Sequence, residues 1–370
     1  MRLAVLGHTY LVAGNRGKLH ALHERGHEIF LAAPQTWPEP DFGLRRFAPD
    51  PRFAVALFDC PRAGHVRRFR FPQPELMRAL RTWRPDVMLA ETEPGGLAAL
   101  QAAYAAAVLG LPLLPFAWEN LPLEARSRAL AWPVYRAARR LLVGSRLAAR
   151  TARDAGYRGP LTVTPQVGVP EVDPPPVRRP RRQPHALFVG RLDRKKGVDL
   201  FLDALAHPAA RDWRATVVGD GSERNALHAQ AVRLKIQKRV TFADAVPHDR
   251  VPSLLADADA LVALSRTVPG WAEQFGHILA QAMNAGVPIV ASRCGAIPEV
   301  VDAAGLLVAE NDAPAAAAAM TRLLDPALRA TLGAIGRERA QRLFTDRAVA
   351  ARLEQALIMA LERNGDDVLL

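Results

Sequence analysis

Short apolar runs alternate with stretches of helical periodicity along nearly the whole 370-residue chain. This alternation constrains the fold more than any other feature, because a strand, a helix and a second strand in this order form a parallel βαβ unit. Only DPPPVRRPRRQP, residues 173–184, interrupts the pattern, since its prolines cannot continue a helix or a central strand. We expect an α/β protein with two doubly wound, Rossmann-like domains joined by an extended linker.

The same pattern predicts where most elements lie. Before the linker we expect strands at residues 2–7, 27–33, 86–90, 111–116, 141–143 and 161–164, and helices at 15–25, 75–82, 97–109 and within 124–155. After it we expect strands at 186–189, 215–218, 240–242, 260–264, 287–291 and 306–308, and helices at 197–206, 223–234, 251–256, 276–286, within 312–343 and at 347–364. The predicted domains are 1–172 and 185–345, with 173–184 as linker and 346–370 as a C-terminal helix packing back on the first domain.

Composition excludes several classes of protein. A chain that is 49% hydrophobic can build two cores, and two cysteines, Cys60 and Cys294, cannot form a disulfide framework. The N-terminal apolar run is too short for a signal peptide, and no run elsewhere is long enough to cross a bilayer. We expect a cytoplasmic protein, peripheral at most on the inner face of a membrane.

The chain is strongly basic, with 49 Lys and Arg against 37 Asp and Glu, and its arginines gather in the first half. A solvated surface and a face for anionic lipid or a lipid-linked acceptor are both compatible with this charge. Nucleic acid is disfavoured, because the sequence contains no helix-turn-helix, RNP or zinc-finger pattern. An anionic membrane surface is therefore an expected partner of the N-terminal domain, and nucleic acid is not.

Residues 271–291, WAEQFGHILAQAMNAGVPIVA, combine an acid, a glycine and the start of a helix. Glu273 precedes Phe275 and Gly276, after which apolar residues recur at helical spacing up to Gly286. Free amides at the start of a helix bind phosphate, and a carboxylate beside them can accept hydrogen bonds from sugar hydroxyls. This combination indicates a nucleotide-sugar site.

The segment resembles the signature of glycosyltransferase family 4, E-x-F-G-x4-E-A-M-A-x-G-x-P-V-V-A, with Gln281 in place of the second glutamate. The resemblance implies a GT-B fold, in which two Rossmann-like domains face each other across a cleft, and a retaining, nucleotide-sugar-dependent enzyme. Ligands of doubly wound sheets bind outside the carboxyl ends of the strands, which places the expected site in that cleft. Glu273 then contacts the donor sugar, and Gln281 holds the ribose with one acceptor oxygen instead of two.

A second motif follows the first strand after the linker. Gly190, Arg191 and Lys196 resemble the G-R-x4-K-G donor-phosphate clamp of the family, in which two cations neutralise a leaving diphosphate in place of a metal ion. Their neighbours Arg194 and Lys195 are expected to face solvent. The donor-side catalytic candidates are Glu273, Arg191 and Lys196, and the further donor-binding residues implied are Gly190, Gly219, Ala245, Val246, Gln274, Phe275, Gly276, Gln281 and Gly295.

The first half lacks the Gly-Gly pair and the histidine that family members usually carry. Its loops contain E-x-E-P at 91–94, W-E-N at 118–120 and P-Q-x-G-V at 165–169, and they resemble those of a bacterial subset of the family. Polar residues at the predicted strand ends are candidates for acceptor binding: His8, Tyr10, Asn15, Glu91, Glu93 and Asn120. Glu119 is a further catalytic candidate, since it or Glu93 could orient or deprotonate an acceptor hydroxyl.

Two groups of residues have side chains that can bind metal ions, but their positions in the sequence do not predict a metal site. Asp257 and Asp259 form a D-x-D at a helix end, where one of the two side chains is expected to face solvent. His20, His23 and His27 lie near one helix face, but His27 begins a strand. We expect no metal site and no cofactor, because the nucleotide-sugar is itself a substrate.

The sequence thus predicts a metal-independent hexosyltransferase. It would move a sugar from a nucleoside-diphosphate donor to a saccharide or lipid-linked acceptor in polysaccharide or glycolipid synthesis. The alternative is a catalytically weakened sugar-nucleotide-binding protein of the same fold, to which Gln281 and the missing histidine point. A phosphorylase of this architecture is disfavoured, because the sequence has no lysine motif for pyridoxal phosphate.

Overall fold

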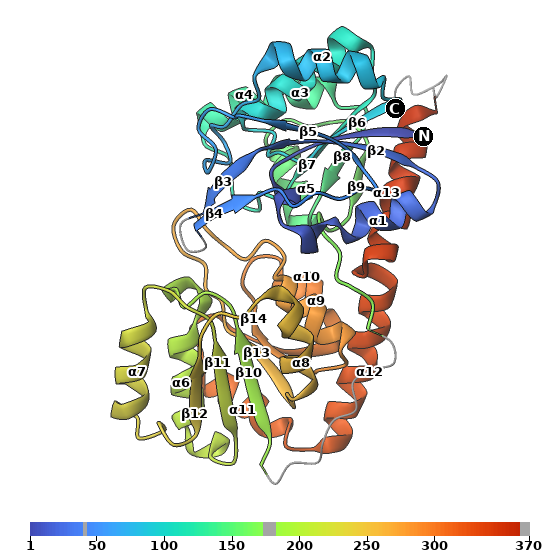
Figure 1. The fold of residues 1–370 in the computed structure, drawn as a ribbon. Helices are drawn as coiled ribbons and strands as arrows, with labels where there is room; N and C mark the ends of the chain where they lie inside the picture. Colours follow the sequence, from blue (N-terminus) through green and yellow to red (C-terminus); the bar gives the residue numbers. More distant parts are fainter. Residues whose placement is uncertain (40–42, 173–182, 363–370) are drawn as a thin grey trace. The chain divides into compact units, whose positions relative to one another are not determined.

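The computed structural model describes residues 1–39, 43–172 and 183–362. The chain divides into two compact units, one formed by Met1–Gly168 with Asp346–Leu370 and the other by Val169–Thr345. Each unit is a parallel sheet with helices packed on it, so the predicted α/β class with two Rossmann-like units is confirmed (Figure 1). Residues 173–182 of the predicted linker lie outside the described residues.

The first unit is built on a seven-stranded sheet of order β5-β2-β1-β6-β7-β8-β9. All neighbouring strands in it are parallel. The strands are β1 Arg2–Leu6, β2 Glu28–Pro34, β5 Ala54–Phe58, β6 Val87–Ala90, β7 Leu113–Ala117, β8 Leu141–Val143 and β9 Leu161–Val163. Every residue of β6 and β7 is buried, which explains why these strands are continuous apolar runs in the sequence.

The helices of the first unit are α1 Gly17–Glu24, α2 Gln73–Trp83, α3 Leu97–Leu109, α4 Ala125–Ala137, α5 Arg146–Asp154 and α13 Asp346–Leu361. Figure 1 shows α2, α3 and α4 on one side of the sheet and α1 and α13 on the other. The last helix, α13, packs against α1, and Leu353 and Leu357 are buried in the same core as the sheet. Glu354 adds a hydrogen bond to His27 of 2.7 Å and an ion pair with Arg25.

Three strands between residues 34 and 60 were not expected from the sequence. These are β5 and a separate antiparallel hairpin, β3 Thr36–Glu39 with β4 Gly43–Arg46. The hairpin strands are short and mostly polar, and β5 is an edge strand with four of its five residues at least partly exposed. The hairpin strands lack the apolar run that marks a buried strand, whereas β5 is a continuous apolar run that was not predicted as a strand.

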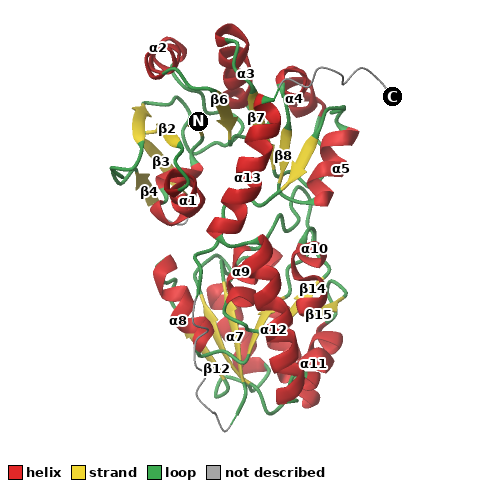
Figure 2. Ribbon diagram, turned by 90° about the vertical axis from the view of Figure 1, so that its right-hand side faces the viewer, coloured by secondary structure: helices red, strands yellow, loops and turns green. Residues whose placement is uncertain are grey.

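The second unit is built on a six-stranded parallel sheet of order β12-β11-β10-β13-β14-β15. Its strands are β10 His185–Val189, β11 Arg214–Val218, β12 Val240–Ala243, β13 Ala260–Ala263, β14 Ile289–Ser292 and β15 Gly305–Val308. Its helices are α6 Val198–Ala206, α7 Arg224–Arg233, α8 Val251–Ala256, α9 His277–Asn284, α10 Ile297–Val301, α11 Ala313–Arg322 and α12 Pro326–Leu343. Helix α12 packs along α9 (Figure 2), and α11 packs on α6.

Each sheet has one point where the chain reverses its direction of winding. In the second unit the chain runs outward from β10 to β12 and then returns to place β13 beside β10. In the first unit β6 lies beside β1 after the chain has passed through β2 and β5. Loops diverge at such a switch point, which makes the carboxyl ends of these strands the places where an α/β sheet accepts a ligand.

No helix among the described residues has the length and apolar character needed to cross a membrane.

Candidate active site

The loops that leave β10 and β13 bring a lysine and a glutamate together at the switch point of the second unit. Lys196 Nζ lies 2.7 Å from Glu273 Oε2, and the same oxygen accepts a 2.9 Å hydrogen bond from Ser265 Oγ. The ammonium also lies 4.8 Å from the centre of the Trp271 ring. The Lys196 side chain is 21% exposed and that of Glu273 is 12% exposed, so the pair is partly shielded but within reach of a ligand.

Arg191 adds a second cation on the β10 loop. Its side chain is 39% exposed, and Nε lies 3.4 Å from Oδ2 of Asp193. Arg194 is exposed as expected, but Lys195 is not a simple solvent-facing residue. Its side chain is only 24% exposed and its ammonium lies 5.1 Å from the Trp271 ring centre. Burial and the neighbouring Arg191 charge lower the pKa of Lys195, which shows how densely the cations are placed.

One glycine of the predicted donor site is required because two loops approach each other closely there. Gly219, directly after β11, has φ 146°, and a Cβ there would lie 1.9 Å from the carbonyl oxygen of Gly190. The loops after β10 and β11 can therefore meet only where one of them has no side chain.

The helix that follows Glu273 begins at a glycine in the left-handed conformation. Gly276 precedes α9 with φ 76°, in the left-handed region that glycine tolerates best. No side chain caps this end of the helix, so its first amides are not taken by a capping residue. Gln274 lies in the same loop and is half-buried. The Phe275 ring instead packs edge-on against Phe344, which indicates that this side chain fixes the loop.

Gln281 has a partner that the sequence did not predict. Its Nε2 lies 3.1 Å from Nε2 of His248, a residue of the short 3-10 helix between β12 and α8. The two residues are 33 positions apart, and no motif links them, so only the fold reveals the pair. Because the contact is exposed, the amide stays accessible to a ligand hydroxyl.

Two further loops reach the same edge of the sheet. After β12, Ala245 is exposed and Val246 is half-buried. After β14, Gly295 has φ 54°, and the amide of Ala296 donates a 2.8 Å hydrogen bond to the carbonyl oxygen of Glu273. The structure therefore places the predicted donor residues of the β10, β11, β12, β13 and β14 loops at one edge of one sheet.

At the corresponding edge of the first unit, Glu91 is buried and paired with neighbouring side chains. It follows β6, is fully buried, and pairs with Lys18 of α1 and with the Tyr10 hydroxyl. Burial and the Glu91 charge raise the pKa of Tyr10, so its phenol stays protonated. These buried contacts hold the loop after β1 in place. They do not support the predicted role of Glu91 and Tyr10 as acceptor contacts. Lys18 was missed because nothing in a helical LysLeuHis stretch marks a buried cation.

Glu93 and Glu119 have different environments within the same region. Glu93 is 1% exposed, and its Oε2 accepts a 3.2 Å hydrogen bond from the Trp118 amide. Burial, followed by the nearby Glu119 charge, raises the pKa of Glu93 to about 8, so it is largely protonated at neutral pH. Glu119 is instead paired with Arg67 at 2.6 Å and its side chain is 20% exposed. Arg67 is a second residue that the sequence did not single out.

His8, Asn15 and Asn120 complete the predicted acceptor set. The His8 ring stacks on Trp37 with 4.2 Å between ring centres, and its Nδ1 is buried without a hydrogen-bond partner among the described residues. Burial lowers the pKa of His8 to about 4, so the ring is neutral. Asn15 donates to the Thr9 carbonyl at 2.9 Å, and Asn120 is buried. Glu91 and Tyr10 are held in buried contacts with Lys18 and with each other, so His8, Glu93 and Glu119 are the candidates that remain for contact with an acceptor.

The residues considered as metal ligands have other roles. Asp259 accepts a 2.8 Å hydrogen bond from the His185 amide and so ties α8 to the start of β10, while Asp257 is exposed. His20 binds Asp50 at 2.8 Å, away from His23 and His27. Within residues 1–39, 43–172 and 183–362, no group of three His, Cys, Asp or Glu side chains is arranged to hold a metal ion.

The two Rossmann-like units with polar loops at their switch points have the architecture that is seen in GT-B glycosyltransferases. Residues 171–339 match the model of the family described as "Glycosyl transferases group 1". The match falls on the second unit, where the Arg191, Lys196 and Glu273 constellation lies. Over these residues the chain is similar to glycosyltransferases of group 1.

Curated relatives are similar over part of the chain. A D-inositol 3-phosphate glycosyltransferase of Acidothermus cellulolyticus is 36% identical over 159 residues, which is 40% of this chain and 34% of that protein. A glycogen synthase of Mycobacterium tuberculosis is 32% identical over 192 residues, 50% of this chain and 44% of that protein. The chain therefore spans less than half the length of these relatives.

Solved structures resemble the chain over nearly its whole length. The sucrose-phosphate synthase of Thermosynechococcus elongatus has a TM-score of 0.73 at 21% identity and covers 97% of this chain and 98% of its own. The Anabaena protein HepE in complex with UDP has a TM-score of 0.73 at 20% identity, over 97% and 100% of the two chains. At these identities the likeness establishes the fold.

Proposed function

We propose that the protein is a metal-independent, retaining glycosyltransferase that uses a nucleoside-diphosphate sugar. The observation that carries the proposal is the ion pair between Lys196 and Glu273, 2.7 Å long and joined by Ser265, at the switch point of the second unit. It combines a cation for phosphate with a carboxylate for sugar hydroxyls within a single contact. Such a pair is suited to exchange its internal partner for a ligand that carries both groups.

Donor binding would redistribute these contacts. Lys196 and Arg191 would take the diphosphate oxygens, since both are cations of the β10 loop with partly exposed side chains. Release of Lys196 would free Oε2 of Glu273 to accept a hydrogen bond from a sugar hydroxyl. The uncapped first turn of α9 behind Gly276 would add backbone amides as further donors to phosphate.

In the transfer step, the main task of the protein would be to stabilise the charge of the leaving diphosphate, and no covalent bond to the protein is needed. As the bond from the anomeric carbon to the diphosphate oxygen breaks, negative charge develops on the leaving group beside Arg191 and Lys196. The acceptor hydroxyl attacks the same face of the sugar, and its proton passes to the departing phosphate oxygen. In the first unit, His8 and the Glu93–Glu119 pair are the proposed groups that orient the acceptor hydroxyl.

Similar proteins support this chemistry by what their names and titles say of them. HepE of Anabaena was crystallised with UDP, with UDP-glucose, and with UDP and glucose. Among the curated relatives are a glycogen synthase and a GDP-mannose-dependent mannosyltransferase acting on a phosphatidylinositol mannoside. By this analogy, we infer a hexose donor and a saccharide or lipid-linked acceptor in polysaccharide or glycolipid synthesis.

An anionic membrane surface is part of the proposal. Helix α4 carries several arginines, its Trp132 is 57% exposed, and the guanidinium of Arg136 lies 5.0 Å from the Trp132 ring centre. An exposed tryptophan among arginines suits the boundary between lipid head groups and water. We therefore propose a cytoplasmic location with peripheral attachment to a membrane.

The alternative is a protein that binds a nucleotide-sugar without efficient transfer. Gln281 favours it, because an amide offers one acceptor oxygen where a carboxylate offers two. The Lys196–Glu273 pair and the partly exposed side chain of Arg191 on the same edge of the sheet favour an active enzyme.

A thermal-shift screen with UDP, GDP, ADP, dTDP and CDP, each with and without EDTA, tests the donor site. A ligand at 100 times its Kd stabilises the folded state by about 2.7 kcal/mol, so one nucleotide should raise the Tm clearly and EDTA should leave the shift unchanged. A transfer assay with the matching sugar nucleotides then separates the two candidates. A shift without product formation identifies the weakened binding protein, and an EDTA-sensitive shift contradicts the metal-free site.

A further inference from the structure

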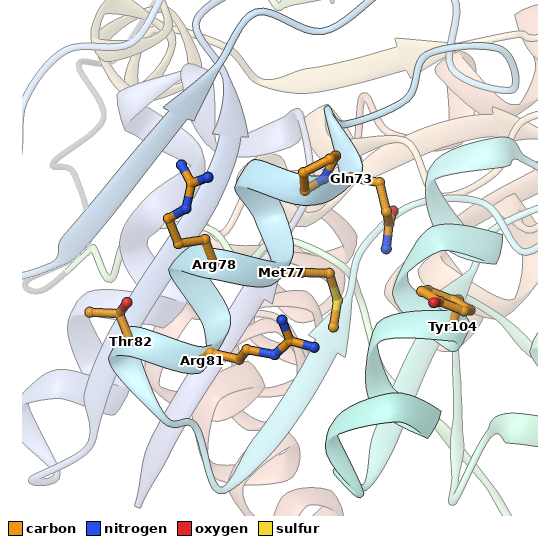
Figure 3. A pocket seen from close by; sticks show the side chains of 7 residues that line it. Gln73, Met77, Arg78, Arg81, Thr82 and Tyr104 are labelled. Atoms are coloured by element: carbon orange, nitrogen blue, oxygen red, sulfur yellow. The ribbon is translucent and has the colours of Figure 1, made fainter.

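A groove between α2 and α3 of the first unit is not explained by the proposed reaction. It is an open groove with a volume of about 620 Å³, and it is lined by Gln73, Pro74, Met77, Arg78, Arg81, Thr82 and Tyr104. Figure 3 shows Gln73, Met77 and Arg81 leaving α2 toward Tyr104 of α3, whereas Arg78 and Thr82 lie on the other side of α2. The spacing of four residues along α2 puts these three side chains on a single helix face.

The amide of Gln73 is the first indication that the groove binds a ligand. Both Nε2 and Oε1 are buried, and neither has a hydrogen-bond partner. The amide and the carbonyl of Phe71, two residues before Gln73, are already paired, because each forms a 2.8 Å hydrogen bond with Gln101 of α3. A buried donor and a buried acceptor left without partners cost stability unless a ligand or water satisfies them.

Charge is the second indication. Arg78 and Arg81 are exposed, and neither pairs with a carboxylate of the described residues. Glu75 of the same helix lines the neighbouring groove instead of this one. Tyr104 is 57% exposed and presents its ring and its hydroxyl to the same space. The groove thus offers positive charge at one end and an amide that can both donate and accept at the other.

We propose that this groove binds the phosphate ester of a polyol. The phosphate would lie against Arg81, within the field of Arg78, because a guanidinium binds phosphate oxygens through paired hydrogen bonds. A neighbouring hydroxyl of the polyol would accept from Nε2 of Gln73 and donate to Oε1, and Tyr104 would cover its apolar face. The same chemistry occurs in a free sugar phosphate and in the head group of an anionic phospholipid. This site is separate from the donor site and does not depend on the proposed reaction.

Binding measurements on the full chain test the proposal and distinguish the two sources. Calorimetric titration with glycerol 3-phosphate, with inorganic phosphate and with glycerol probes the free ligand. Cosedimentation with phosphatidylcholine vesicles, with and without phosphatidylglycerol, probes the head group. The variants are Arg81→Gln and Gln73→Leu, and Arg150→Gln on the exposed side of α5 is the matched charge control.

Loss of a charge-assisted hydrogen bond should weaken binding by roughly tenfold or more in Arg81→Gln, while Arg150→Gln binds as the unchanged protein does. Gln73→Leu should also lose affinity, yet its Tm without ligand should stay level or rise, because two unpaired buried groups disappear. Saturable binding of glycerol 3-phosphate assigns a free ester, and binding only to phosphatidylglycerol vesicles assigns the lipid. The proposal is overturned if neither probe binds, or if all three variants lose binding equally.

Discussion

The two sheets share one topology at their switch points but use their polar residues in opposite ways. In the second unit, Lys196 and Glu273 are partly exposed and linked to Ser265, so their charges can be transferred to a ligand. In the first unit, Lys18 and Glu91 form an ion pair with side chains only 2% and 0% exposed. The first pair is accessible for binding, and the second stabilises the loop that follows β1.

The difference lies in how deeply each loop is covered. Removing two charges from water costs several kcal/mol per ion, so a fully buried pair persists only with good geometry and must stay intact. A partly exposed pair gains little net stability and can open at little cost. The same topology therefore supplies a rigid edge in one unit and an exchangeable edge in the other.

The largest expected effect separates the two lysines by stability. Lys18→Met leaves the buried Glu91 charge without its cation and should lower the free energy of unfolding by about 3–5 kcal/mol. Lys196→Met should change it by less than about 1 kcal/mol, because that pair is partly solvated. Urea denaturation of both variants measures the contrast, and equal losses would refute the distinction between the two edges.

The second-largest expected effect is a loss of turnover when Lys196 of the second unit is replaced. Lys196→Ala should lower kcat by about 10²–10³-fold, because a preorganised cation no longer stabilises the leaving diphosphate. Arg194→Ala, an exposed neighbour on the same loop, serves as control and should retain the original rate. Steady-state kinetics with the sugar nucleotide found in the screen gives both values. Retained turnover in Lys196→Ala would remove this lysine from the mechanism.

A pH dependence sharpens the account of the first unit. Burial raises the pKa of Glu93 to about 8 in the folded state, against about 4.5 when unfolded. Between these values the unfolded chain releases the proton and the folded chain keeps it, so this residue lowers stability as the pH rises. Between pH 5 and 7 the loss should be of the order of 2 kcal/mol. Glu93→Gln should flatten this slope in denaturation curves, and an unchanged slope would show that Glu93 is ionised in the fold.

The smallest expected effect concerns the amide that departs from the family signature. Gln281→Glu restores a second acceptor oxygen and should tighten nucleotide binding by about fivefold, or 1 kcal/mol. His248→Ala, which removes the 3.1 Å partner of Gln281, tests whether that contact positions the amide. Calorimetric titration with the selected nucleotide measures the affinity of both variants. Weaker binding by Gln281→Glu would mean that the amide is adapted to this donor.

Much of the second unit could be predicted from the sequence. The G-R-x4-K-G and E-x-F-G motifs identified Arg191, Lys196 and Glu273, and the predicted strands coincide closely with β10 to β15. Local signals suffice there, because each motif sits directly after a buried apolar strand, and parallel strands bring their carboxyl ends to one edge. The first unit was harder, since the hairpin strands β3 and β4 have no apolar run, and β5, although apolar, is an edge strand with most of its residues at least partly exposed.

The sequence by itself determined the α/β class, the two Rossmann-like units and the position of three charged residues after strands of the second sheet, because periodicity and motif spacing are local properties. Only the tertiary structure decided which polar residues remain available. It buried Glu91 against Lys18, raised the pKa of Glu93, and brought His248 to Gln281 and Gln73 to Tyr104 across a groove. Burial and pairing depend on neighbours distant in sequence, so no local pattern records them.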